Sequence, residues 1–261
     1  MTYTTVTEVV ARFDEIIAHA KRDQDRIGYF AALYCRVTRT IKQAVDDGTF
    51  EHGENIERII LGFAGRYFEA MDAYRAGSKP SESWAVAFKA SEEWPPVLIQ
   101  HLGLGMNAHI NLDLGVAIAQ VFPGDKIDAF AGDYDKVNDV LFSLMDEIVR
   151  EFGQVWPIIK QADRFLRGSE LSVLDFDMQS SRKHAWDVAK RLAHLEGKAQ
   201  IHAITEIDHE VGVWGRKIWK PIFPIRVFLY IFRLTDRLNT AHTIDILNEP
   251  GLKKADVQKS D

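Results

Sequence analysis

Cysteine is almost absent from this sequence, because Cys35 is the only one in 261 residues. A single cysteine excludes an internal disulfide, and it excludes a zinc site built from cysteines. We therefore expect Cys35 to be a small core residue in a protein of the reducing cytoplasm.

Excess positive charge and long apolar runs are also lacking. The formal net charge is −6, which argues against nucleic acid as a partner. The most apolar run, 218–232, is interrupted by Lys220, Arg226 and two prolines and is too short for a comfortable membrane span. We expect no transmembrane segment and no signal peptide. Core packing is the expected role of 218–232, and a lipid-facing or partner-facing patch is the alternative.

Several motifs of known enzyme classes are missing from the sequence. It contains no P-loop, no G-x-G-x-x-G after a predicted strand, no H-E-x-x-H helix and no nucleophile elbow. Nucleotide-dependent chemistry and serine-triad chemistry therefore have no support in the sequence.

Apolar residues recur at helical spacing along most of the chain. The pattern predicts helices over 7–20, 24–46, 55–76, 81–90, 96–121, 134–151, 154–165, 180–195, 198–217 and 225–248. No window alternates with the period of a strand, so little or no sheet is expected. We expect one compact all-α domain over 1–248, built around the helix 96–121 and followed by a polar, frayed tail over 249–261.

The segment 95–121 reads PPVLIQHLGLGMNAHINLDLGVAIAQV and is apolar on nearly every side, which predicts a buried helix. It nevertheless carries five polar residues: His101, Asn107, His109, Asn111 and Asp113. A buried polar group without a partner costs about 1–3 kcal/mol, so these side chains need a network, a metal or a ligand. Gly103, Gly105 and Gly115 lower helix propensity here, which indicates close approach by neighbouring helices or a ligand.

His109 and Asp113 lie four residues apart and share a face of the predicted helix. An imidazole and a carboxylate at this spacing can form half of a metal site, or a general base with its orienting carboxylate. The alternative is a buried hydrogen bond that stiffens the core. Asn107 and Asn111 point nearly the other way, which favours structural roles for them.

The segment HLGLGMNAHINLDLG, together with GRYFEAMDAY, WAVAF and SRKHAW, resembles an uncharacterised family of bacterial single-domain proteins. The signature of that family is close to HLLLGMNAHINLDL, and the resemblance covers most of the chain. It implies a soluble, mainly helical domain without an established activity. Zinc-dependent phospholipases C and related single-strand nucleases are also all-helical with an H-x-x-x-D pair, but their further metal ligands have no counterparts here.

Three residues outside the central helix join the candidate site. Arg66 lies in an apolar segment and suits a bidentate grip on a carboxylate or phosphate. The alternative is a structural bridge, for example to Asp113, which would compete with a metal. Tyr67 is its neighbour, and Asp208 could bring a second carboxylate from another apolar helix.

Residues 175–186 contain a possible anion site at a helix N-terminus. It would use Ser181, Arg182, His184 and Trp186 after a cap at Asp177, and capping plus surface packing is the alternative.

Asp139, Ser143 and Glu147 repeat at helical spacing and resemble the magnesium-binding triad of helical terpene cyclases. The partner aspartate-rich motif has no convincing counterpart, and a solvated helix face is the alternative.

We therefore expect a small-molecule enzyme with a helix-lined apolar pocket. Its catalytic residues would be His109, Asp113, Arg66, Tyr67 and Asp208. The reaction on a hydrophobic substrate would be metal-assisted hydrolysis, with a divalent metal on His109 and Asp113, or an acid–base cyclisation or isomerisation. The alternatives are a non-catalytic protein that binds an apolar ligand or a partner helix, and a purely structural role for the polar residues. A homodimer fits any of these.

Overall fold

The computed structural model describes residues 3–94, 96–155, 178–223, 225–235 and 239–249. Every regular element within these ranges is a helix, which confirms the predicted all-α class. The elements are α1 (Val6–Asp23), α2 (Ile27–Asp46), α3 (Gly53–Arg75), α4 (Glu82–Glu92), α5 (Leu98–Ala108), the π-helix η1 (His109–Leu114), α6 (Gly115–Val121), the 3-10 helix η2 (Gly124–Phe130), α7 (Ala131–Val155), α9 (Met178–Ala193), α10 (Gly197–Trp219), α11 (Ile225–Thr235) and α12 (Thr240–Asn248).

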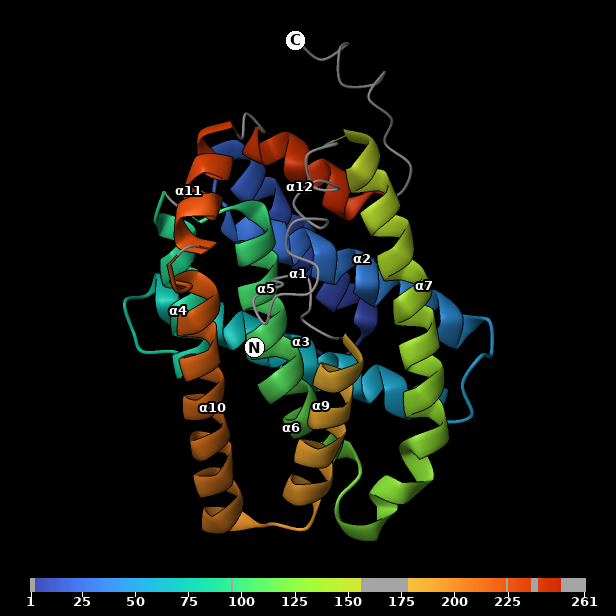
Figure 1. Cartoon of the computed structure of the whole chain (residues 1–261). Coiled ribbons are helices and arrows are strands. Elements are labelled where there is room, and N and C mark those ends of the chain that lie inside the picture. The colour runs from blue at the N-terminus through green and yellow to red at the C-terminus, as the bar shows by residue number, and fades with distance from the viewer. Residues whose placement is uncertain (1–2, 95, 156–177, 224, 236–238, 250–261) are drawn as a thin grey trace.

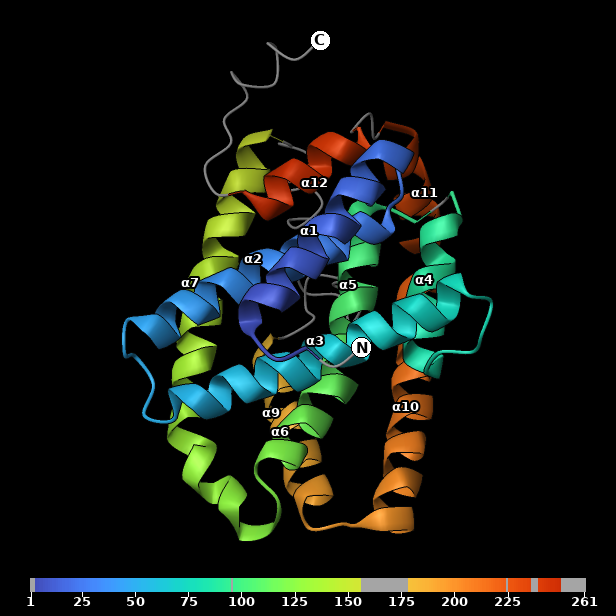
Figure 2. The same ribbon diagram turned by 180° about the vertical axis from the view of Figure 1, so that it is seen from behind.

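The elements α5, η1 and α6 form one helix through the middle of the molecule, as the sequence predicted (Figures 1 and 2). It packs against α2, α3, α4, α9 and α10. Figure 2 shows α1, α2 and α3 crossing this helix on one side, whereas α9 and α10 run alongside it and α7 runs roughly parallel to it at the edge of the molecule. The helix is π-helical over His109–Leu114, which holds both His109 and Asp113. Such single π turns inside α-helices are frequent at functional sites.

Local capping explains where several helices begin. Thr5 and Glu8 form a capping box at the start of α1, and the Ser81 hydroxyl accepts from the Trp84 amide at the start of α4. The single helix predicted over 225–248 is wrong, because the Asn239 side chain accepts from the amides of Ala241 and His242 and begins α12 there.

Two sequence predictions fall largely outside the described residues. Of the helix predicted over 154–165, only residues 154–155 are described, at the end of α7. Of the tail predicted over 249–261, only Glu249 is described.

Two of the three central glycines lie where another helix approaches closely. A Cβ on Gly105 would be 2.3 Å from the Phe30 ring, and a Cβ on Gly115 would be 2.5 Å from Val188 Cγ1. At Gly103 it would make ordinary contact with Ile218 at 3.6 Å. The close approach inferred from the glycines is therefore correct for α2 and α9.

The apolar run 218–232 packs in the core on one face only. Ile225 and Leu229 are buried with Val97, whereas Phe223 is 79% exposed and Ile231 is 56% exposed. Within the described residues, no helix combines the length and the apolar character needed to cross a membrane.

Candidate functional site

Asp113 lies at the centre of the fold and is fully buried. The Nε of Arg66 on α3 donates to its Oδ1 at 2.5 Å, and the Nε1 of Trp84 on α4 donates to its Oδ2 at 2.7 Å. Burial raises the pKa of Asp113, and the contacts with Arg66 and Trp84 oppose that rise. The Arg66–Asp113 bridge that the sequence allowed is present, and both carboxylate oxygens have partners.

His109 is enclosed by aromatic rings. Its imidazole stacks on Phe63 with centroids 3.4 Å apart and an interplanar angle of 7°, and the Tyr34 ring lies 3.9 Å away. Burial lowers the pKa of His109 well below its usual value, and the positive charge of Arg182 lowers it further. The imidazole is therefore neutral, and its Nδ1 has no hydrogen-bond partner among the described residues.

Two buried hydroxyls lie in the same cluster. The rings of Tyr34 and Tyr67 are 6.0 Å apart, and neither hydroxyl has a partner in the described part of the chain. Burial raises the pKa of both phenols, so both are protonated donors. Three polar atoms without partners among the described residues, counting His109 Nδ1, thus belong to neighbouring buried rings, where unsatisfied groups are costly.

The structure places Asp208 away from this cluster. Its carboxylate accepts from the amides of Glu82 and Ser83 at 2.6 and 2.9 Å, and from the Ser83 hydroxyl at 2.7 Å. Asp208 therefore holds the N-terminus of α4, and α4 carries the Trp84 that contacts Asp113.

The other polar residues of the central helix have different surroundings. Asn107 Nδ2 donates to the Val211 carbonyl at 2.9 Å, and Asn111 Nδ2 donates to Asn107 Oδ1 at 3.0 Å. The Asn107 bond ties the central helix to α10, whereas the Asn111 bond lies within the central helix and orients the Asn107 side chain. Both asparagines thus have structural contacts. His101 is buried, and burial lowers its pKa to about 3.

A metal bridging His109 and Asp113 is not favoured by this arrangement. No hydrogen bond or ion pair joins the two side chains in the described ranges, and Asp113 already faces a guanidinium. Among the described residues, no three His, Cys, Asp or Glu side chains lie close enough together to hold a metal ion. The donor set therefore does not match a divalent metal site.

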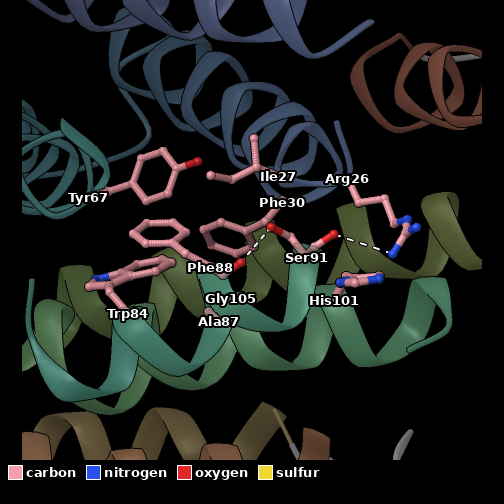
Figure 3. A pocket seen from close by; sticks show the side chains of 10 residues that line it. All are labelled: Arg26, Ile27, Phe30, Tyr67, Trp84, Ala87, Phe88, Ser91, His101 and Gly105. Carbon is pink, nitrogen blue, oxygen red and sulfur yellow. Dashed lines mark hydrogen bonds between the residues drawn. The ribbon is translucent and has the colours of Figure 1, made fainter. Parts of the chain in front are cut away.

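A first cavity, called the Tyr67 cavity here, lies between α2, α3, α4 and α5 (Figure 3). Figure 3 shows Tyr67, Phe30 and Phe88 at one end and His101 beside Arg26 at the other. The space amounts to about 280 Å³, including its opening to solvent.

A second and larger cavity, called the Arg182 cavity here, lies next to the cluster, since Tyr34 and Phe63 form part of its wall. It holds about 530 Å³ of empty space, including its open mouth. Its wall comes from α2, α3, η1, α6, η2, α7 and α9 and is aliphatic or aromatic except at Thr38 and Arg182 and at the tyrosine hydroxyls. It is an apolar chamber with few polar groups.

The sequence did not predict two residues of this cavity wall, and it indicated a different role for a third. Tyr34 and Thr38 gave no signal, because they lie on a helix with an ordinary amphipathic pattern. Arg182 was noted for an anion site at a helix end, but it is buried and faces the cavity. Ser181 is half-buried and His184 is exposed, and the expected cap Asp177 lies outside the described residues.

The acid-rich stripe on α7 forms ordinary surface contacts. Asp139 is exposed, Ser143 donates to the Asp139 carbonyl, and Glu147 pairs with Arg36 at 3.1 Å. This arrangement fits the solvated face that was the alternative to a magnesium triad.

Comparison with family models gives a match over residues 6–221, to a family of unknown function, DUF5995. The chain belongs to this family. The matched region includes the central helix, both cavities and every candidate site residue. No curated protein and no solved structure matches the chain. Membership of the DUF5995 family supports the expected kinship with an uncharacterised family and assigns no activity.

Proposed function

We propose that this protein binds a hydrophobic small molecule in the Arg182 cavity. The observation that carries the proposal is an apolar chamber, open at its mouth, beside the buried cluster of the central helix. Ligand sites are typically concave and mostly apolar, with a few placed polar groups. Empty apolar space also lowers stability, so a ligand that fills this chamber would offset the loss.

Calorimetric titration with n-decanol tests this proposal, because the probe is apolar and uncharged. The Val137→Phe variant fills the cavity from α7, where Val137 forms part of the wall. Val140→Phe is the matched control, since Val140 is also half-buried on α7 but is not in that wall. We expect saturable binding to the wild type and to Val140→Phe, weakened about tenfold or more by Val137→Phe. No saturable binding, or equal binding by Val137→Phe, would overturn the proposal.

Catalysis on the bound molecule is the second candidate, and one observation favours it. Tyr34 forms part of the cavity wall, and its ring lies 3.9 Å from the His109 ring behind that wall. The Tyr34 hydroxyl and His109 Nδ1 have no partner among the described residues, and together they could move or hold a proton on a ligand. Tyr67 lines the Tyr67 cavity and would act as a positioning residue through its ring contact with Tyr34. Arg66 and Asp208 would act as positioning residues through Asp113 and α4. This is the acid–base version of the enzyme expected from the sequence.

The molecules that co-purify with the protein distinguish the two candidates. Mass spectrometry of organic extracts should find different molecules in the wild type and in His109→Gln if His109 takes part in a reaction. The same molecule in both proteins would leave binding as the function. Metal-assisted hydrolysis would need stoichiometric metal in the purified protein. A cytoplasmic location, a bacterial origin of the family and a homodimer stay predictions.

A further inference from the structure

Arg182 is a buried cation without an acidic partner among the described residues. It is 5% exposed, its Nε donates to Asn138 Oδ1, and its guanidinium lies 4.7 Å from the Tyr134 ring centroid. Within the described ranges its Nη2 has no hydrogen-bond partner. A buried charge without compensation is among the most costly features in a fold, so such a group calls for an explanation.

Two other arginines that reach the interior have acidic partners. Arg36 is as buried as Arg182, and its Nη1 lies 2.7 Å from Glu151. Arg66 pairs with Asp113. The fold therefore places a carboxylate beside each of these two guanidinium groups. Arg182 lacks such a carboxylate among the described residues, and it lies in the wall of the cavity.

Two further hydroxyls without partners among the described residues belong to side chains of the same cavity wall. The Tyr34 hydroxyl and the Thr38 hydroxyl lie one helical turn apart on α2, and neither has an acceptor among the described residues. The Tyr134 hydroxyl is already used, because it donates to the Arg182 carbonyl at 2.6 Å. The unused polar atoms of the wall thus comprise one cation and two hydroxyls, and all three can donate to an anion.

We propose that the ligand of the Arg182 cavity is a hydrophobic carboxylic acid whose carboxylate pairs with Arg182. This inference rests on the proposed function and names the chemistry of its ligand. A guanidinium binds a carboxylate through two parallel hydrogen bonds, and the Tyr34 and Thr38 hydroxyls supply further donors. The aliphatic wall from α3, α6 and α7 receives the apolar chain of the acid.

Parallel titrations with n-decanoate and n-decanol test this inference, because the two probes differ in headgroup alone. We expect the wild type to bind decanoate about tenfold or more tightly than decanol. Arg182→Met should abolish this preference while it still binds decanol, and Arg182→Lys should keep part of it. Arg191→Met is the matched control, because Arg191 lies on the same helix but is exposed and paired with Glu206.

The outcomes separate this inference from the proposed function. Equal binding of the two probes by the wild type, or an unchanged preference in Arg182→Met, would overturn the inference that the ligand is an acid. It would not contradict the proposed apolar site. Binding of neither probe would overturn both. Thermal unfolding of ligand-free Arg182→Met checks its fold, and we expect a melting temperature at or above that of the wild type, because an uncompensated charge has been removed.

A separate surface feature lies on and around α11. Most of the large apolar side chains that are exposed in the described part of the chain lie within residues 214–234. The exceptions are Ile201 and Trp94, and the Trp94 ring packs against Tyr230. Ile225 and Leu229 face inward, so the opposite face of α11 presents Val227, Tyr230, Ile231 and Leu234 to solvent. Contiguous apolar surface of this kind marks an interaction site.

The charge of this segment indicates the nature of the partner. Residues 211–235 contain five Lys and Arg and no Asp or Glu, in a chain whose net charge is −6. Arg216 pairs with Glu82, whereas Arg226 and Arg233 flank the exposed face of α11. A second copy of the chain would bring like charges together across a twofold interface, which is unfavourable.

We infer that this face docks on an anionic lipid surface. Apolar and aromatic side chains flanked by Lys and Arg are typical of helices that lie in a membrane interface. Co-sedimentation with vesicles of phosphatidylcholine, alone or mixed with phosphatidylglycerol, tests the inference. We expect binding to the mixed vesicles only, lost in Phe223→Ser/Ile231→Ser, reduced in Arg226→Glu and kept in the control Ile201→Ser. No binding to mixed vesicles, or a wild-type dimer that Ile231→Ser separates, would overturn it.

Discussion

The buried side chain of Asp113 has one contact that the sequence predicted and one that it did not. The sequence allowed its bridge to Arg66, because an arginine in an apolar segment needs an acid. It gave no sign of the bond from Trp84, since no spacing rule relates an indole on α4 to a carboxylate on η1. Pairing between distant segments depends on how the helices pack, and local patterns do not encode it.

Replacing Trp84 by Phe removes a bond to a buried carboxylate but keeps an aromatic ring in place. Hydrogen bonds to charged groups contribute about 1.5–3 kcal/mol, so we expect Trp84→Phe to lower the free energy of unfolding by about 2 kcal/mol. Urea unfolding measures this loss. The control is Trp94→Phe, because Trp94 is 46% exposed and should change stability little. Equal effects of the two variants would show that the Asp113 bond is unimportant.

His101 makes stability sensitive to acid. Its pKa is about 3 in the folded protein, against an ordinary value of 6.5, so the unfolded chain binds the proton more readily. The neutral His101 ring contributes its full stabilisation at pH values above 6.5, and this stabilisation is lost as the pH falls toward 3. We therefore expect His101→Phe to lose less stability than the wild type between about pH 7 and about pH 5.

Unfolding midpoints in urea at the two pH values measure this difference. His184→Gln is the control, because the His184 side chain is exposed and has no ion-pair partner among the described residues, so the variant should keep the pH dependence of the wild type. An acid sensitivity of His101→Phe equal to that of the wild type would contradict the account. The lowered pKa of His109 acts in the same direction and explains any sensitivity that remains.

At the scale of the elements, most helices and the central position of one of them could be predicted from apolar periodicity. The π turn at His109–Leu114 could not, because an apolar helix gives no clear stripe from which to read a local change of register. The break between α11 and α12 was missed because both helices are apolar and the cap at Asn239 was not recognised. Glycine positions did predict the close contacts at Gly105 and Gly115.

Gly105 offers a test of helix packing. An alanine Cβ there would lie 2.3 Å from the Phe30 ring, so α2 or the ring must move. We expect Gly105→Ala to lower the free energy of unfolding by about 1–3 kcal/mol. At Gly65 on α3 a Cβ would meet no atom of the described residues within 4 Å, so Gly65→Ala should stabilise the protein by about 0.5–1 kcal/mol. Opposite signs in urea unfolding are expected, and a harmless Gly105→Ala would refute the close packing.

At the scale of the whole molecule, the candidate site was predicted in part. His109, Asp113, Arg66 and Tyr67 lie in or beside one buried cluster, as their segments suggested, whereas Asp208 caps α4. The Arg182 cavity was not located from the sequence, because it forms only where segments from residue 34 to residue 182 meet. Burial of a polar residue can be predicted from a single helix, but the empty space beside it cannot.

The most direct test of a ligand site in this cavity is a crystal structure of the protein soaked with ω-bromodecanoate. Anomalous scattering from the bromine reports the position of the chain end. We expect an anomalous peak between the aliphatic side chains of α3 and α7, with the carboxylate density at Arg182. A peak elsewhere on the molecule, or an empty cavity in crystals that bind the compound, would contradict it.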